Sequence, residues 1–145
     1  MKNIFIQSIS SDIGYELALF WLSKGHCVRG TYRNVSEKTQ ELEDKGVELI
    51  RCDLLDKHSV DECGDWINRH ESWDVIILAA GTQDPIGMLE NINFDEWENS
   101  ILQNFTRQIR LIHKILPSRN KHESTPVVLM FAGGGTNNAT VRYSA

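Results

Sequence analysis

Small and polar residues fill the segment from residue 8 to residue 14, Ser-Ile-Ser-Ser-Asp-Ile-Gly, between a short apolar run and an apolar pattern with helical spacing. Backbone N–H groups at the start of a helix bind a pyrophosphate, and Ser10 and Ser11 add hydroxyl donors. Gly14 lets the helix pack close to the preceding strand. The alternative interpretation is an ordinary helix whose N-cap is Ser11 or Asp12.

A second candidate site lies at the end of the next apolar run, at Tyr32-Arg33-Asn34. Arg33 follows Gly14 by about twenty positions, where dinucleotide-binding proteins carry either an acid for the ribose 2′-hydroxyl or an Arg for a 2′-phosphate. No Asp or Glu occurs between residues 26 and 36. The pattern therefore predicts NADP rather than NAD, with a solvated surface arginine as the alternative.

The ends of two later apolar runs offer further contacts to a ligand. Asp53 can accept a hydrogen bond from an adenine amino group, or it can cap a turn or the next helix. The small residues Ala79, Ala80 and Gly81 allow the backbone to approach a flat ligand, or they serve packing alone. The five histidines and three cysteines have no metal-ligand spacing, so we expect no metal site and reduced thiols.

Two kinds of apolar pattern alternate along the chain, and the strands and helices that they predict must position these loops. Short apolar runs predict strands, and patterns with helical spacing predict helices. The expected strands are 3–7, 26–32, 47–50, 74–80 and 127–131, and the expected helices are 13–22, 36–45, 60–67 and 97–112, the last ending near Pro117. This order predicts one domain over residues 1–145, a doubly wound Rossmann-like parallel sheet of about five strands in three α/β/α layers.

Composition excludes several classes of function. The 145 residues carry a net charge of −5, which gives no basic field for nucleic acid. No apolar run approaches the roughly 20 residues of a membrane span, and the amino-terminal residues do not form a secretory signal. We therefore expect a cytoplasmic protein that contacts neither nucleic acid nor membrane.

The glycine-loop segment resembles that of the short-chain dehydrogenase/reductase family, and the likeness extends over essentially the whole chain. That family has the loop T-G-x-x-x-G-x-G, and the segment here is Gln7 to Gly14, in which Ser8 and Asp12 take two glycine positions. Serine fits this place without strain if its φ is negative. Asp12 brings a carboxylate near the pyrophosphate and weakens binding, unless it caps the helix and points away.

Further motifs carry the same resemblance. The loop filling Ser10-Ser11-Asp12-Ile13-Gly14 is common in the family; Asp53-Leu54 resembles its adenine-contacting pair, and Leu78-Ala79-Ala80-Gly81 resembles its N-N-A-G. Asn104, seven positions after Trp97, matches the family's W-x-x-x-x-x-x-N helix. The resemblance implies that Asn104 holds the structural water of a proton relay.

The residues from 131 to 145 resemble the approach to the family's catalytic Tyr and Lys. In one register Ala132 takes the position of the catalytic Ser, and the Tyr follows Ala145. In the other register Tyr143 is the catalytic Tyr. We favour the first because the triple glycine sets the spacing; in both, the Lys falls beyond residue 145, so we expect little turnover from this chain alone.

The resemblance implies an NADP(H)-dependent oxidoreductase acting on a small-molecule carbonyl or secondary alcohol, of which this chain is the cofactor-binding part. The alternatives are a non-catalytic dinucleotide-binding module and an interaction protein that binds no nucleotide. The strand at 127–131 should form an exposed sheet edge, which predicts a homo-oligomer.

Overall fold

A parallel five-stranded sheet forms the centre of the protein, in the order β3-β2-β1-β4-β5. The computed structural model describes residues 1–122 and 127–130, and all statements below concern these residues. The strands are β1 (Asn3–Gln7), β2 (Cys27–Tyr32), β3 (Glu48–Arg51), β4 (Val75–Leu78) and β5 (Val127–Met130). The predicted doubly wound, Rossmann-like α/β fold is confirmed.

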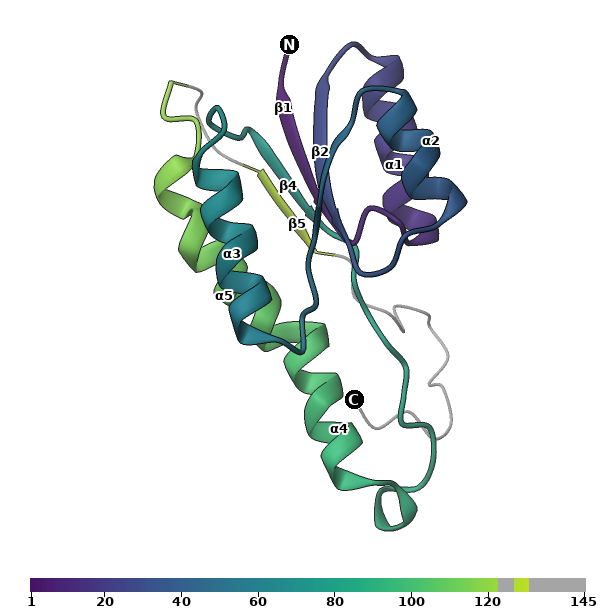
Figure 1. Ribbon diagram of the computed structural model, residues 1–145. Helices are drawn as coiled ribbons and strands as arrows, with labels where there is room; N and C mark the ends of the chain where they lie inside the picture. Colours follow the sequence, from purple (N-terminus) through teal and green to yellow (C-terminus); the bar gives the residue numbers. More distant parts are fainter. Residues whose placement is uncertain (123–126, 131–145) are drawn as a thin grey trace.

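Helices cover both faces of this sheet (Figure 1). On one side lie α1 (Asp12–Ser23) and α2 (Glu37–Asp44), and on the other lie α3 (Lys57–Asn68) and α5 (Arg107–Ile115). The helix α4 (Phe94–Ile101) extends beyond the sheet, at the end where the strands finish. Short turns complete the order: η1 (Leu89–Asn91), η2 (Leu102–Thr106) and η3 (Leu116–Ser118).

Two apolar clusters form the core, one on each face of the sheet. Alternate residues of a strand point to opposite faces, so β1 contributes Ile4 and Ile6 to one cluster and Phe5 to the other. Because both faces are covered, the central strands read as continuous apolar runs; Val75, Ile76, Ile77 and Leu78 of β4 are all buried. Burying each such side chain contributes about 1.5–3 kcal/mol.

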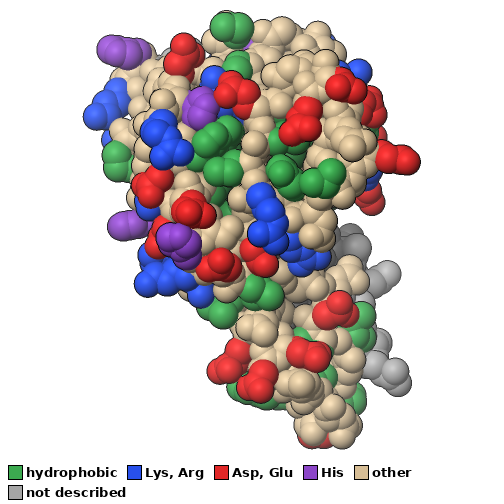
Figure 2. Space-filling model, viewed as in Figure 1, with side chains coloured by type: hydrophobic (Ala, Val, Ile, Leu, Met, Phe, Trp, Pro, Cys, Tyr) green, Lys and Arg blue, Asp and Glu red, His purple; other side chains and the backbone are tan. Residues whose placement is uncertain are grey.

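Charged pairs join α3 to α5 on the outer surface. Arg110 binds Asp61 through two hydrogen bonds, of 2.8 Å from Nε and 2.7 Å from Nη2. These bonds lower the pKa of the Asp61 carboxyl below its ordinary value. Lys114 lies 3.0 Å from Asp65 one turn further along. On this face acidic and basic side chains are interspersed, whereas acidic ones gather on the projecting part around α4 (Figure 2).

The long helix expected over residues 97–112 is interrupted. The described helix consists of α4, a π turn (η2) and α5. Gln108 follows this turn, and its side-chain Nε2 donates to the Gln103 carbonyl at 2.9 Å and to the Ala80 carbonyl at 3.1 Å. The wider turn thus has side-chain partners that join it to the loop after β4. Pro117 lies in η3, directly after α5, as the sequence predicts.

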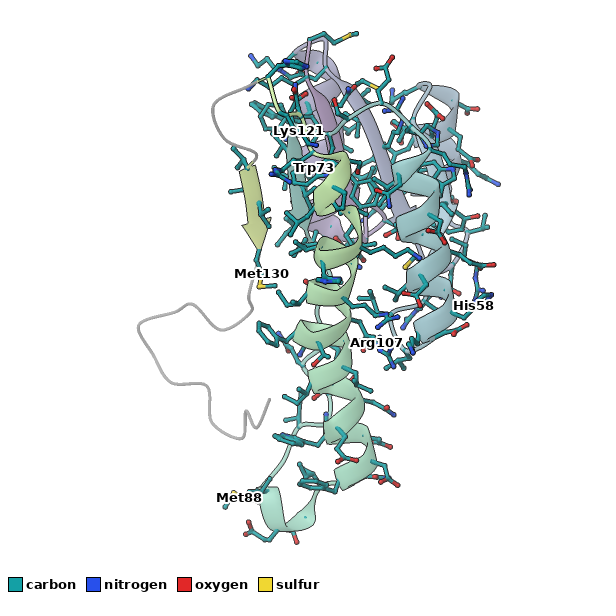
Figure 3. All side chains as sticks on the ribbon, turned by 90° about the vertical axis from the view of Figure 1, so that its left-hand side faces the viewer. His58, Trp73, Met88, Arg107, Lys121 and Met130 are labelled. Carbon is teal, nitrogen blue, oxygen red and sulfur yellow. The ribbon has the colours of Figure 1, made fainter. Side chains whose placement is uncertain are left out.

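The strand β5 lies at one edge of the described sheet, ending at Met130 (Figure 3). Each of its four residues is 40–42% exposed. An apolar edge strand of this kind offers backbone and side-chain surface to another segment. Among the helices that the structure describes, none is both long and apolar enough to cross a membrane.

Candidate functional site

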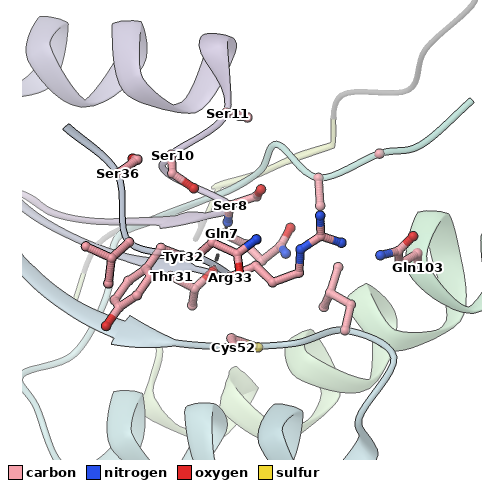
Figure 4. A pocket seen from close by; sticks show the side chains of 15 residues that line it. Gln7, Ser8, Ser10, Ser11, Thr31, Tyr32, Arg33, Ser36, Cys52 and Gln103 are labelled. Atoms are coloured by element: carbon pink, nitrogen blue, oxygen red, sulfur yellow. Dashed lines mark hydrogen bonds between the residues drawn. The ribbon is translucent and has the colours of Figure 1, made fainter. Parts of the chain in front are cut away.

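A pocket of about 300 Å³ opens at the carboxyl ends of the strands, where ligands of doubly wound sheets bind (Figure 4). It is lined by the ends of β1, β2, β3 and β4 and by one residue of η2. The lining residues are Gln7, Ser8, Ser10, Ser11, Thr31, Tyr32, Arg33, Asn34, Val35, Ser36, Cys52, Leu54, Ala80, Gly81 and Gln103. Nine of the predicted cofactor contacts are therefore brought together here.

Ser8 forms the corner between β1 and the loop, with a φ of +60°. Serine fits this position without strain only if its φ is negative, and the φ of Ser8 is positive. Instead, Ser8 adopts the left-handed conformation that glycine takes without cost, and it is the single non-glycine residue with positive φ in the described part of the chain. For an L-residue this conformation costs about 1–2 kcal/mol.

The loop closes directly onto helix α1. The Ser11 side chain caps the helix by accepting from the Gly14 backbone N at 3.0 Å, and the Ser11 backbone N donates to the Ser8 carbonyl at 3.0 Å. A Cβ on Gly14 would lie 2.5 Å from the Ser8 carbonyl oxygen and 2.9 Å from the Ile9 Cα. Only glycine therefore allows the helix to begin this close to the strand.

Asp12 neither caps α1 nor lines the pocket. Its carboxylate binds Lys38 of α2 and is 96% exposed, and this hydrogen bond lowers the pKa of Asp12. The like-charge repulsion expected of an acid in the loop is reduced, because the Lys38 ammonium offsets the charge outside the pocket.

Arg33 alone is charged among the described residues that line the pocket. It directly follows β2, and its backbone carbonyl accepts from the Arg51 Nε at 3.1 Å. Its side chain extends across the pocket toward Gln103, as Figure 4 shows. Since the other described lining residues are neutral, this guanidinium gives a positive potential suited to an anionic ligand.

Four predicted cofactor contacts do not line the pocket. Gly14 acts through the backbone packing above, Ile13 is 50% exposed, and Ala79 is buried against the sheet core. Asp53 turns toward the next helix: its Oδ1 accepts from the Leu55 backbone N at 3.0 Å, and its own backbone N donates to Ser59. Its neighbours on both sides, Cys52 and Leu54, do line the pocket.

Asn104 lies in the π turn η2 and joins it to the loop after β4. Its Oδ1 accepts from the Thr82 backbone N at 2.8 Å, and its Nδ2 donates to the Thr82 carbonyl at 2.9 Å. Its Oδ1 also lies 3.8 Å from where a Cβ on Gly81 would stand. Asn104 thus borders the pocket next to Gly81 without lining it. Tyr143, the other predicted catalytic residue, and Ala132 lie outside the described residues.

Sequence reasoning missed several lining residues, chiefly Gln7, Thr31, Cys52 and Gln103. A polar residue inside an apolar strand run is the signal that finds two of them: Gln7 and Thr31 are 2% and 1% exposed. The Gln7 Oε1 has no hydrogen-bond partner among the described residues. Cys52 contacts the buried Cys63, and a hydrogen bond between the two thiols lowers the pKa of Cys52 and raises that of Cys63.

Comparisons with known proteins agree with this fold. The family model of the short chain dehydrogenases matches residues 2–145, so the chain belongs to the short-chain dehydrogenase/reductase family. It is 24% identical over 147 residues to the short-chain dehydrogenase/reductase olcF of Penicillium canescens. That match covers 98% of this chain and 56% of the Penicillium protein.

Solved structures share the fold. A variant of actinorhodin polyketide ketoreductase with NADPH superimposes with a TM-score of 0.83 at 19% identity, covering 98% of this chain and 57% of that one. A short-chain dehydrogenase/reductase from Serratia marcescens gives 0.74 at 18% identity, covering 82% and 51%. BdcA in complex with NADPH gives 0.72 at 18% identity, covering 83% and 48%. The chain thus spans about half the length of these relatives.

Proposed function

We propose that the pocket binds NADP(H) and that the chain supplies the cofactor site of an oxidoreductase acting on a small-molecule carbonyl or secondary alcohol. The observation that carries this proposal is the position of Arg33 in a pocket at the carboxyl ends of the strands, where no other residue of the described lining is charged. An Arg at the end of the second strand suits a ribose 2′-phosphate, while an acid there suits the unmodified ribose of NAD. NADPH complexes among the structural relatives fit the same preference.

The described residues suit the parts of such a cofactor. Ser10, Ser11 and the backbone at the start of α1 offer hydrogen-bond donors for the pyrophosphate. Leu54 and the small residues Ala80 and Gly81 provide apolar surface for flat rings. When bound, the nicotinamide supplies or accepts a hydride, and the protein's task is to hold and orient it.

Proton transfer needs its own side chains besides those that hold the cofactor. We assign Asn104 and Tyr143 as the candidates within this chain, as the family resemblance implies. Asn104 contributes by holding Thr82, the residue directly after the pocket-lining Gly81. In the second of the two registers, Tyr143 would be the general acid or base toward the substrate oxygen; in the register we favour, that role belongs to the residue after Ala145.

The test of the cofactor assignment is a fluorescence titration of the purified chain with NADPH and with NADH. We expect tighter binding of NADPH, and Arg33→Ala should raise its Kd roughly tenfold while changing the Kd of NADH less than about threefold. Arg69→Ala is the matched control, since Arg69 is an exposed arginine at the carboxyl end of α3 and outside the pocket. Equal weakening of both cofactors by Arg33→Ala would contradict the 2′-phosphate assignment.

A non-catalytic dinucleotide-binding module is the second candidate. The replacement of two loop glycines by Ser8 and Asp12 favours it. Cofactor binding without hydride transfer in the full-length protein would support this module, and turnover would exclude it. An unchanged melting temperature at millimolar NADP and NAD would exclude both candidates and leave an interaction protein.

We also propose that the protein self-associates through the β5 edge, whose four apolar residues are 40–42% exposed. Light scattering tests this: a monodisperse monomer, in a sample whose β5 amides are protected from hydrogen exchange, would contradict it.

A further inference from the structure

We propose that Thr31 is a positioning residue of the pocket: its hydroxyl holds Ser8 in the left-handed conformation and so fixes the loop that faces the ligand. The inference deepens the proposed function, because it rests on this pocket being the cofactor site. Thr31 makes this corner possible with serine in place of glycine at position 8.

Thr31 bonds two successive residues of the corner. The Ser8 backbone N donates to the Thr31 Oγ1 at 2.8 Å, and the Ile9 backbone N donates to the Thr31 carbonyl at 2.8 Å. The pairing of β1 with β2 ends one step earlier, at Ile6 and Gly30. Thr31 therefore bonds the chain at the point where the regular strand pairing stops and the chain turns away from the sheet.

The contact is buried and lies at the pocket itself. Thr31 is 1% exposed, and both Thr31 and Ser8 line the pocket. A backbone N–H in such a place has no water to replace a lost partner, so the hydroxyl matters more than on the surface. A strained residue persists only where its surroundings determine its conformation, and the Thr31 hydroxyl is part of those surroundings.

The consequence depends on the residue at position 8. Serine favours a negative φ, so without the Thr31 hydroxyl the corner should relax and move Ser10 and Ser11 away from the ligand. Glycine adopts either sign of φ about equally, so the same loss should matter less once residue 8 is glycine. If Thr31 were only an ordinary buried hydrogen-bonding residue, its loss would cost the same in both backgrounds.

A double-mutant cycle separates these cases, using the full chain, thermal unfolding and NADPH titration. Thr31→Val removes the hydroxyl and keeps the shape. We expect it to lower Tm by about 5 °C and to raise the Kd of NADPH roughly tenfold. In the Ser8→Gly background both effects should fall, to less than about half of the Tm loss and less than about threefold in Kd.

Two further variants serve as controls. Thr31→Ser keeps the hydroxyl and should retain NADPH affinity within about twofold. Thr39→Val removes the hydroxyl of another buried threonine, a residue that is 2% exposed. The Thr39 hydroxyl accepts a hydrogen bond from the Ser36 backbone N in the cap of α2. Its Tm loss should be the same in the unsubstituted and the Ser8→Gly backgrounds, since the Thr39 hydroxyl bonds within the α2 cap and not to the corner.

Equal losses from Thr31→Val in both backgrounds would overturn the proposal. If Thr31→Val does not fold, folding of the Ser8→Gly, Thr31→Val double variant supports the proposal, and failure of the double variant overturns it. Absence of NADPH binding by the unsubstituted chain would overturn the proposed function instead. The thermal cycle then still decides the role of Thr31, because it needs no ligand.

Discussion

The side-chain amide of Asn104 pairs with both backbone groups of Thr82, accepting at 2.8 Å from its N–H and donating at 2.9 Å to its carbonyl. This pair connects the π turn η2 with the loop that follows β4, next to Gly81 of the pocket. The pairing uses both functions of a primary amide, so a carboxylate or an apolar group of similar size cannot replace it.

Asn104→Asp should therefore destabilise the chain by about 1–3 kcal/mol, because a carboxylate cannot donate to the Thr82 carbonyl and places negative charge beside it. Urea unfolding measures the change. Asn99→Asp is the matched control, since Asn99 is exposed one turn earlier in α4, and it should change the unfolding free energy by less than about 0.5 kcal/mol. Similar losses for the two variants would refute a structural role of the Asn104 amide.

Two helical glycines should respond differently to alanine. Gly14→Ala places a Cβ 2.5 Å from a backbone oxygen and should cost about 2–3 kcal/mol while weakening NADPH binding. Gly64→Ala in α3 places its Cβ 2.7 Å from Lys114 Cδ and 2.9 Å from Lys114 Cγ, so the Lys114 side chain must take another rotamer. The gain in helix propensity offsets that movement, so stability should change by less than about 1 kcal/mol. Denaturant unfolding of both variants checks the contrast.

The Asp61–Arg110 pair should give an acid-dependent contribution to stability. The folded-state pKa of Asp61 lies below the ordinary value of 3.8, so this contribution is complete above about pH 4 and is lost as pH falls through the lowered pKa. Asp61→Asn should lower Tm by about 2 °C at pH 7, and its difference from the unsubstituted chain should shrink below pH 4.

Asp65→Asn provides the comparison for that measurement within the same pair of helices. The Asp65 carboxylate is 58% exposed and has one contact with Lys114, whereas Asp61 is 28% exposed and accepts two hydrogen bonds. The Asp65 variant should therefore change Tm less. A difference for Asp61→Asn that stays constant from pH 7 to pH 3 would contradict the pairing.

The sequence predicted the order of strands and helices because both faces of the sheet impose a clear apolar pattern. Gly25 illustrates how a local signal works: it lies just after α1 with a φ of +75°, the left-handed conformation in which glycine commonly ends a helix. The π turn was not predicted. Asn104 in this turn bonds to Thr82, 22 residues away in the sequence, and no local sequence pattern indicates such a contact.

Only part of the candidate site could be predicted, because some of its residues are placed by topology and others by contacts with distant segments. Ser10, Ser11 and Arg33 follow strand ends, so topology alone brings them to the pocket. The direction of Asp12 depends on Lys38 of another helix, and the turn of Asp53 depends on local hydrogen bonds. The φ of Ser8 contradicts what its residue type favours, because tertiary hydrogen bonds outweigh that preference.

The hydrogen bond between Ser8 and Thr31 has a consequence for building chimeric proteins. The two residues are 23 positions apart, so the segment from β1 to α1 does not carry all that its loop needs. Grafted alone onto another doubly wound sheet, this glycine-poor loop would lose the contact that keeps its shape. The smallest portable unit is β1, α1 and β2 together, moved as one piece of about thirty residues.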